Sequence, residues 1–242
     1  MTLDNITNPI AMRRDLHKCF RLLFQQYLPT DAVVYDVGCG QKPFAEFLKG
    51  KVSQHIGVDL ADGFYKPDYV DLIGSAYEVP APDGAADAVI LSQVIEHLES
   101  PLLAIQEAQR LLKPGGLVFL SFPFLYPIHA PPRDYCRFTE FYLTSSIIGE
   151  NFEVVDSIRL GGYWYLMGMF AHMYLQDANR GVVKATLVVK VVSWAMGMTC
   201  LVLHKIEGAL LRLAGKNAEA IRAKWTANYL AVLRMKDSRV SS

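Results

Sequence analysis

The stretch DVGCGQKPF, from Asp36 to Phe44, decides how this sequence folds. It joins the apolar run AVVYDVG, typical of a buried strand, to the segment PFAEFLKG, typical of a helix with proline in its first turn. Gly38 and Gly40 allow the backbone of the connecting turn to approach a ligand closely. Such a turn, between a strand and a helix of an α/β protein, is a common place for nucleotides to bind. The sequence therefore predicts a nucleotide-binding turn after the first strand.

The details of this turn favour a nucleoside without phosphates. The dinucleotide fingerprint GxGxxG is incomplete, because Pro43 stands at its third glycine and removes an N–H group that a pyrophosphate would use. Asp59 ends the next apolar run, IGVDL, nineteen residues after Gly40. An acid at about this spacing holds ribose hydroxyl groups in nucleotide-binding folds. A tight glycine turn alone is weak evidence, and it is the combination with Asp59 that predicts a nucleoside site.

Strands and helices alternate along the first two thirds of the chain. Strands are expected over residues 32–38, 55–60, 68–74, 85–92, 117–123 and 152–160, and helices over 11–28, 43–50, 100–116 and 139–150. This alternation indicates an α/β domain with a mostly parallel sheet and helices on both faces. The segment ANYLAVLRMK, residues 227–236, is expected to form one more strand. Residues 163–224 would then be an insertion before the last strand.

Four segments, taken in order, resemble a known family. VYDVGCG, IGVDL, DGAADAVILSQVIEHLESP and RLLKPGGLVFLSFP are similar to successive motifs of the class I S-adenosylmethionine-dependent methyltransferases, over roughly residues 30 to 160. The resemblance implies a Rossmann-like, seven-stranded sheet with helices on both faces, whose last strand is antiparallel and inserted beside the sixth. It also implies that the chain is an enzyme that uses S-adenosylmethionine as its cofactor.

The resemblance assigns cofactor-binding roles by position. The residues are Asp36, Gly38, Cys39, Gly40, Asp59, Leu60, Ser75, Ala76, Ser92 and Gln93. The turn, together with Ser92 and Gln93, would face the methionine part of the cofactor, and Asp59 would bind the ribose. Ser75 stands where family members often have an acid that holds the adenine amine. Lys42 stands at a third family glycine, a second departure of this sequence from the family pattern.

Two polar segments are expected to surround the methyl acceptor. Glu96 and His97 follow the fourth strand, and the proline-rich loop FPFLYPIHAPPRDYCRFTEFYL follows the fifth. Methyl transfer is an in-line displacement that needs an aligned acceptor and, for a hydroxyl, a base, and it requires no metal. We expect His129 as the base, with His97 as the alternative, and Tyr135 and Arg137 as further catalytic candidates. Each also has a structural interpretation, such as loop bracing by His97.

The loop pattern suggests an acceptor class. PxHxPPRDYCRFT resembles a subgroup of bacterial methyltransferases of surface-polysaccharide and natural-product pathways, which often have Trp where Cys136 stands. This implies methyl transfer, mainly to oxygen, on a small-molecule or glycan-like acceptor. Two other classes stay open: a module that binds the cofactor without turnover, and a nicotinamide oxidoreductase. The absence of a YxxxK pair and of the third phosphate glycine disfavours the oxidoreductase.

The expected organisation has three parts. They are an N-terminal helix over 1–30, acting as a lid or packed on the sheet edge, a methyltransferase domain over 31–162 and 225–237, and a helical insertion over 163–224. Within the insertion, residues 185–203 carry one charge, Lys190, and nearly reach the length of a membrane span. One crossing would separate the last strand from its sheet, so the chain must cross an even number of times or not at all.

The insertion has three possible partners. Between Arg180 and Lys224, eight basic residues against two acidic ones give a net charge of +6, which suits anionic lipids. A polar stripe formed by Thr186, Lys190, Ser193, Gly197 and His204 suits a helix at a membrane interface or packed on protein. The alternatives to a membrane surface are a cap over the acceptor pocket and a homodimer contact.

Composition limits the cellular setting. The formal net charge is zero, and we expect no nucleic-acid partner. The four cysteines are scattered without a CxxC pair, which argues against disulfides and against a zinc site. Residues 1–15 have no apolar core of a signal peptide. We therefore expect a cytoplasmic protein, either free or peripheral to the inner membrane, without a metal.

Overall fold

A computed structural model describes residues 9–61, 69–142, 145, 149, 151–178 and 186–236. Its strands are β1 (Val33–Val37), β2 (Gln54–Asp59), β3 (Leu72–Ile73), β4 (Ala86–Ser92), β5 (Leu112–Pro123), β6 (Phe152–Gly161) and β7 (Thr226–Met235). Its helices are α1 (Pro9–Tyr27), α2 (Ala45–Leu48), the 3-10 helix η3 (Ile95–His97), α3 (Pro101–Leu111), α4 (Glu140–Tyr142), α5 (Tyr163–Ala178), α6 (Thr186–Leu213) and α7 (Ala218–Arg222).

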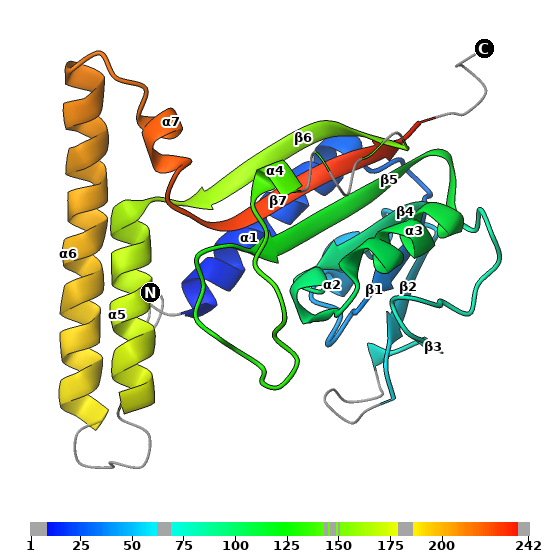
Figure 1. Cartoon of the computed structure of the whole chain (residues 1–242), viewed down its shortest axis with the longest axis horizontal. Helices are drawn as coiled ribbons and strands as arrows, with labels where there is room; N and C mark the ends of the chain where they lie inside the picture. The colour runs from blue at the N-terminus through cyan, green and yellow to red at the C-terminus, as the bar shows by residue number, and fades with distance from the viewer. Residues whose placement is uncertain are drawn as a thin grey trace. The chain divides into compact units, whose positions relative to one another are not determined.

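All the described strands belong to one seven-stranded sheet, in the order β3-β2-β1-β4-β5-β7-β6 (Figure 1). The pairs β1–β2, β1–β4, β2–β3 and β4–β5 are parallel. Figure 1 shows β7 running opposite to its neighbours β5 and β6. The expected Rossmann-like sheet, with a helical insertion before its last strand, is confirmed. Because β1, β2, β4 and β5 are parallel, their carboxyl ends share one edge, where ligands bind in such folds.

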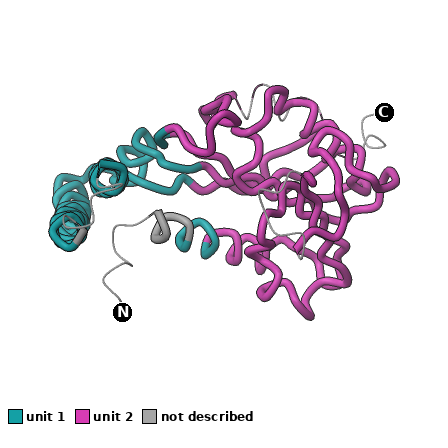
Figure 2. The backbone as a smooth tube through the Cα atoms, turned by 90° about the horizontal axis from the view of Figure 1, so that it is seen from below, with its two compact units in different colours: residues 1–18, 125–127, 159–228 teal, residues 19–124, 128–158, 229–242 magenta. Residues whose placement is uncertain are grey.

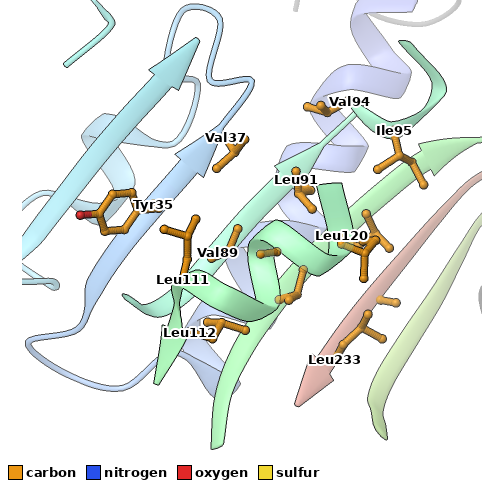
Figure 3. Packing of buried hydrophobic residues seen from close by; sticks show 14 of the residues in the cluster. Tyr35, Val37, Val89, Leu91, Val94, Ile95, Leu111, Leu112, Leu120 and Leu233 are labelled. Carbon is orange, nitrogen blue, oxygen red and sulfur yellow. The ribbon is translucent and has the colours of Figure 1, made fainter. Parts of the chain in front are cut away.

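The central strands are apolar because both of their faces are covered. Val89 and Leu91 of β4 are buried with Leu120 of β5, Leu111 of α3 and Leu233 of β7 (Figure 3). Burying each such side chain contributes roughly 1.5 to 3 kcal/mol. This core fixes the ends of β4 and β5, from which the polar segments of the site begin.

The start of β5 differs from the sequence prediction. β5 begins at Leu112, directly after α3, so Pro114, Gly115 and Gly116 lie in the strand instead of following the helix as a stop. The helix expected over 139–150 begins with α4, whereas residues 143–144, 146–148 and 150 lie outside the described residues. At the start of β5, tertiary context outweighs local propensity.

The second half of α1 is part of the core. The ring centroids of Phe20 and Phe44 lie 4.9 Å apart, and those of Phe24 and Phe119 lie 4.8 Å apart. Phe20 and Phe24 are almost fully buried. Residues 19–27 therefore support the interpretation of this helix as an element packed on the sheet, and residues 1–8 of the expected lid lie outside the described residues.

The chain divides into two compact units (Figure 2). One contains residues 1–18, 125–127 and 159–228, and therefore the helices α5, α6 and α7. The other contains residues 19–124, 128–158 and 229–242. Every residue of the site described next belongs to this second unit.

Candidate active site

The turn after β1 has a backbone that glycine permits. Gly38 has a φ of +71°, and a Cβ atom there would lie 2.5 Å from Cγ2 of Val94. Gly40 has a φ of +52°. The N–H groups of Gly38 and Cys39 donate to the carbonyl oxygen of Val58 at 2.8 and 3.1 Å. The turn is thereby held against the end of β2, where the predicted ribose acid lies.

Asp59 holds this turn in place. Its Oδ2 atom accepts a hydrogen bond from the N–H of Gly40 at 2.7 Å, and its Oδ1 atom accepts from the N–H of Leu60 at 2.8 Å. A carboxylate has about four acceptor sites, so each oxygen keeps a lone pair for a ligand hydroxyl. The acid at the end of β2 is therefore fixed in direction beside the glycine turn, as a ribose site requires.

Lys42 keeps the conformation of the glycine that it replaces. Its φ is +48°, and its Nζ atom pairs with Asp71 and donates to the carbonyl oxygen of His55 at 2.9 Å. Room for this side chain comes from Gly57, where a Cβ atom would lie 2.5 Å from Cε of Lys42 and 2.8 Å from Sγ of Cys39. The sequence analysis missed Asp71 and Gly57, whose roles depend on contacts between strands.

Several other predicted cofactor residues have protein partners in the structure. Asp36 is buried, with Oδ2 at 3.1 Å from Nε2 of His55. Burial raises the pKa of the Cys39 thiol to about 12, so this cysteine is not a nucleophile at neutral pH. Oγ of Ser75 accepts a hydrogen bond from the N–H of Tyr77 at 3.1 Å. Ala76 packs against the main core.

The end of β4 places Ser92 and Gln93 next to β5. Oγ of Ser92 lies 3.4 Å from Oγ of Ser121, and Nε2 of Gln93 donates to the same Ser121 oxygen at 3.1 Å. Gln93 has a φ of +58°, and its N–H donates to the carbonyl oxygen of Ser121 at 3.0 Å. Ser121, which the sequence analysis did not single out, is thus the buried residue that positions both side chains.

Glu96 is the most unusual group at this edge. It is fully buried in η3, and neither carboxylate oxygen has a hydrogen-bond partner among the described residues. Burial raises the pKa of Glu96 to about 8. Its carbonyl oxygen accepts from the N–H groups of Tyr135 and Cys136 at 2.9 and 3.3 Å, which ties the loop after β5 to η3.

The two candidate bases lie side by side. The ring centroids of His97 and His129 are 4.8 Å apart, with an interplanar angle of 72°. Nδ1 of His97 lies 2.5 Å from the carbonyl oxygen of Arg133, and its Nε2 lies 3.9 Å from Oε1 of Glu96. The tertiary structure therefore joins the two segments that the sequence analysis treated as separate alternatives.

Asp134 and Arg137 form an ion pair behind His129. Two guanidinium nitrogens of Arg137 lie 2.6 and 2.8 Å from the carboxylate of Asp134, which also accepts the N–H of His129 at 2.8 Å. The hydrogen bonds from Arg137 lower the pKa of Asp134 to about 2. Nη2 of Arg137 lies 3.3 Å from Nδ1 of His129. The structure thus places Arg137 where it orients the imidazole.

Tyr135 is directed elsewhere. Its phenol is hydrogen-bonded to Glu99, which raises the pKa of Tyr135, and the residue is 46 % exposed. Its backbone contacts Glu96, as described above, but its hydroxyl is not part of the histidine pair. Its predicted catalytic role therefore has no support from its partners in the structure.

Comparison with known proteins finds similarity to methyltransferases. Residues 35–120 match the family described as Methyltransferase domain. The chain is 31 % identical, over 101 residues, to the ubiquinone biosynthesis O-methyltransferase of Leptothrix cholodnii, which covers 36 % of this chain and 43 % of that protein. It is 30 % identical, over 115 residues, to the ubiquinone/menaquinone biosynthesis C-methyltransferase of Caulobacter vibrioides, covering 48 % and 40 % of the two chains. The matched part is thus less than half of each relative.

Solved structures confirm the fold over most of the chain. A proposed methyltransferase from Bacillus halodurans has a TM-score of 0.55 at 15 % identity and covers 93 % of this chain and 100 % of that one. The [4+2]-cyclase SpnF also has a TM-score of 0.55, at 20 % identity, covering 90 % and 81 %. The glycine turn and the acid after β2 both lie within residues 35–120, the part of the chain that matches the Methyltransferase domain family, which uses S-adenosylmethionine as methyl donor.

Proposed function

We propose that this protein transfers the methyl group of S-adenosylmethionine to an oxygen atom of a small-molecule or glycan-like acceptor. One observation carries the proposal: the cofactor turn and a pair of histidines both lie at the carboxyl edge of the parallel strands β1, β2, β4 and β5. In-line transfer needs the donor, the acceptor and a base at one place, and the cofactor turn and the histidine pair at this edge support the donor and the base.

The histidine pair favours oxygen as the accepting atom, because a hydroxyl must lose its proton during transfer. Of the two, His129 is our first candidate, since the Asp134–Arg137 ion pair holds its backbone and its ring. His97 is the alternative, since its Nδ1 atom is held by the Arg133 carbonyl and its Nε2 atom lies 3.9 Å from Oε1 of Glu96. The relatives include both O- and C-methyltransferases, so the accepting atom needs a direct test.

An alternative function is cofactor binding without methyl transfer. A [4+2]-cyclase has a similar fold, and a shared fold does not determine a reaction. This similarity is the reason to test the alternative. The test is incubation of the purified protein with donor carrying a labelled methyl group and panels of phenolic and sugar acceptors. Labelled product would support the proposal. Tight S-adenosylhomocysteine binding with no product from any panel would support the alternative.

The cofactor site gives the first prediction. Asp59→Ala should weaken S-adenosylhomocysteine binding by tenfold or more, because it removes hydrogen bonds from ribose to a carboxylate, worth roughly 1.5 to 3 kcal/mol each. The same change frees the N–H of Gly40. Calorimetric titration of the two proteins measures the difference.

Asp59→Asn is the matched control for this prediction. Its amide oxygen can still accept the N–H of Gly40, but it lacks the charge, so its affinity should lie between those of the wild type and Asp59→Ala. Circular dichroism checks that both variants are folded. Equal affinities in all three proteins would show that the ribose site lies elsewhere.

We also propose that the α5–α6 helix pair contacts an anionic lipid bilayer. On α6 a polar side chain faces the neighbouring helix, whereas large apolar side chains are exposed. Ser193 is buried with Oγ at 2.5 Å from Nδ1 of His172, and Gly197 packs near Gly168 of α5. Ser193 and Gly197 of the polar stripe thus face α5, whereas Lys190 of the same stripe is exposed. The opposite side exposes large apolar side chains, which are Leu187, Val188, Val191, Val192, Met196, Val202, Ile206, Leu210 and Leu213. Residues Leu187–Leu213 are long and apolar enough to cross a membrane.

Aromatic and basic residues at one end of the helix pair fit a membrane interface. The ring of Tyr163 lies 5.1 Å from those of both Trp164 and Trp225, and Trp225 is 43 % exposed. Exposed Lys216 and Lys224 lie in the same stretch of chain as Trp225. Tryptophan and tyrosine concentrate at membrane interfaces, and lysine favours the cytoplasmic side. A helix pair that enters the bilayer and returns to the same side also leaves β7 on the side of its sheet.

The second prediction tests this contact. The protein should float with vesicles of phosphatidylcholine and phosphatidylglycerol, and less with phosphatidylcholine alone. Added salt should weaken but not abolish flotation, because charge attraction is screened over about 10 Å at 0.1 M whereas apolar burial is not. Changing Lys190, Lys205 and Arg212 to Gln should reduce the dependence on anionic lipid.

Two glutamate substitutions separate apolar burial from charge. Val191→Glu, on the exposed side of α6, should reduce flotation, whereas Leu103→Glu, on an equally apolar exposed site of α3, should not. If the wild type does not float with any vesicle, the lipid proposal is wrong. Light scattering would then distinguish a dimer contact from a cap over the acceptor site.

A further inference from the structure

Glu96 poses a problem that the methyl-transfer site leaves unsolved. Its side chain is fully buried, and both oxygens lack a hydrogen-bond partner among the described residues. An unpaired carboxylate in a protein interior is strongly unfavourable unless it takes up a proton or meets a cation. The main chain of Glu96 is held in place, because two backbone N–H groups of the loop after β5 donate to its carbonyl oxygen.

Two imidazoles lie at the same place. Glu96, His97 and His129 each offer one ligand atom, and these atoms all lie within 4.8 Å of one another. In a tetrahedral zinc site with bonds near 2.0 Å, neighbouring ligand atoms are about 3.3 Å apart. Small side-chain rotations of His97 and His129, both partly exposed, would bring the three ligand atoms to that spacing.

Groups behind the histidines orient them as metal ligands are oriented. Nδ1 of His97 lies 2.5 Å from the carbonyl oxygen of Arg133, so this nitrogen carries the proton and Nε2, facing Glu96, is left as the donor atom. Nδ1 of His129 lies 3.4 Å from Oδ2 of Asp134, which Arg137 holds in place. A carbonyl or a carboxylate behind each ligating imidazole is the usual arrangement in metal sites.

We infer that Glu96, His97 and His129 form a binding site for one divalent transition-metal ion. Two imidazoles and one carboxylate suit zinc, iron or manganese, and three protein ligands leave a coordination position open. The sequence analysis expected no metal, because methyl transfer requires none and the scattered cysteines argue against a zinc site.

The open position suggests a role that rests on the proposed methyl transfer. An ion there would bind the acceptor hydroxyl as a Lewis acid and lower its pKa, so that the oxygen reaches the donor methyl group deprotonated. The bond to the methyl carbon forms as the bond from carbon to sulfur breaks, and the hydroxyl proton leaves to solvent, because both histidines would then be metal ligands and neither would act as the base. Metal binding itself needs neither donor nor acceptor, so it can be tested alone.

The test is a calorimetric titration of chelator-treated protein with zinc alone. We expect one equivalent to bind. Glu96→Gln, His97→Ala and His129→Ala should each weaken binding by at least tenfold, whereas Glu99→Gln, a nearby exposed carboxylate, should not. Cobalt in place of zinc should give a visible spectrum without the near-ultraviolet thiolate band that a cysteine site would show.

The outcomes separate this inference from the proposed function. No saturable binding of zinc, cobalt or manganese, or equal binding by all the ligand variants, would overturn the metal site and leave Glu96 as a protonated core residue. His129→Ala, on the loop, keeps the test valid should Glu96→Gln fail to fold. A protein that binds metal and S-adenosylhomocysteine but methylates nothing would instead contradict the proposed function alone.

Discussion

Replacing His129 with alanine should lower methyl-transfer turnover by about 100-fold or more while S-adenosylhomocysteine affinity stays unchanged. A positioned acid–base group typically contributes 100- to 10,000-fold to a rate, and a residue that acts only in the transfer step leaves ground-state binding intact. Asp59 accepts hydrogen bonds from the N–H groups of Gly40 and Leu60, whereas the N–H of His129 donates to Asp134. Steady-state kinetics and calorimetry, run on the same preparations, measure both quantities.

Comparison with His97→Ala distinguishes the possible roles. If His129 is the base, its loss should be more severe than that of His97. If both histidines are metal ligands, both variants should fail alike and both should lose zinc. Ile128→Ala, a change at an 83 % exposed neighbour on the same loop, controls for loop disturbance. Full turnover in His129→Ala, with none in His97→Ala, would move the role of base to His97.

Glu96→Gln should stabilise the metal-free protein increasingly as the pH rises. The folded-state pKa of Glu96 is raised to about 8 from its usual 4.5 by burial, so the folded protein keeps a proton that the unfolded chain releases. The contribution of Glu96 to the free energy of unfolding is therefore fully present below pH 4.5 and is lost as the pH rises through 8. Relative to the glutamine variant, the unfolding free energy of the wild type should fall by up to about 1.4 kcal/mol per pH unit within this range.

Urea denaturation with a chelator present, at a series of pH values, measures this difference. Glu99→Gln is the matched control, since Glu99 is exposed, and it should give a curve parallel to the wild type. A difference between wild type and Glu96→Gln that does not change with pH would contradict the burial argument. Repeating the series with zinc links the two proposals, because a bound ion would stabilise the ionised carboxylate and flatten the pH dependence.

Local features of the sequence were sufficient for the fold and the cofactor edge. Strand and helix periods, the glycine turn and the spacing from Gly40 to Asp59 are encoded within short stretches, and the parallel sheet brought those stretches together as predicted. The insertion before the last strand was also predictable, because β7 has a strand pattern of its own after a long apolar segment. Lys42 showed a limit: its left-handed backbone depends on Gly57 and Asp71, which belong to other elements.

The meeting of Glu96, His97 and His129 was decided only by the tertiary structure. The sequence presented the two histidines as alternatives on separate segments, because nothing local states that the loop after β5 folds back on η3. The burial of Glu96 was equally hidden, since a carboxylate is ordinarily expected at the surface. The polar stripe on α6 was visible as a pattern, but only packing against α5 decided which side of the helix was left exposed. Periodicity identifies the faces of an element, whereas the partner of each face is set by long-range contacts.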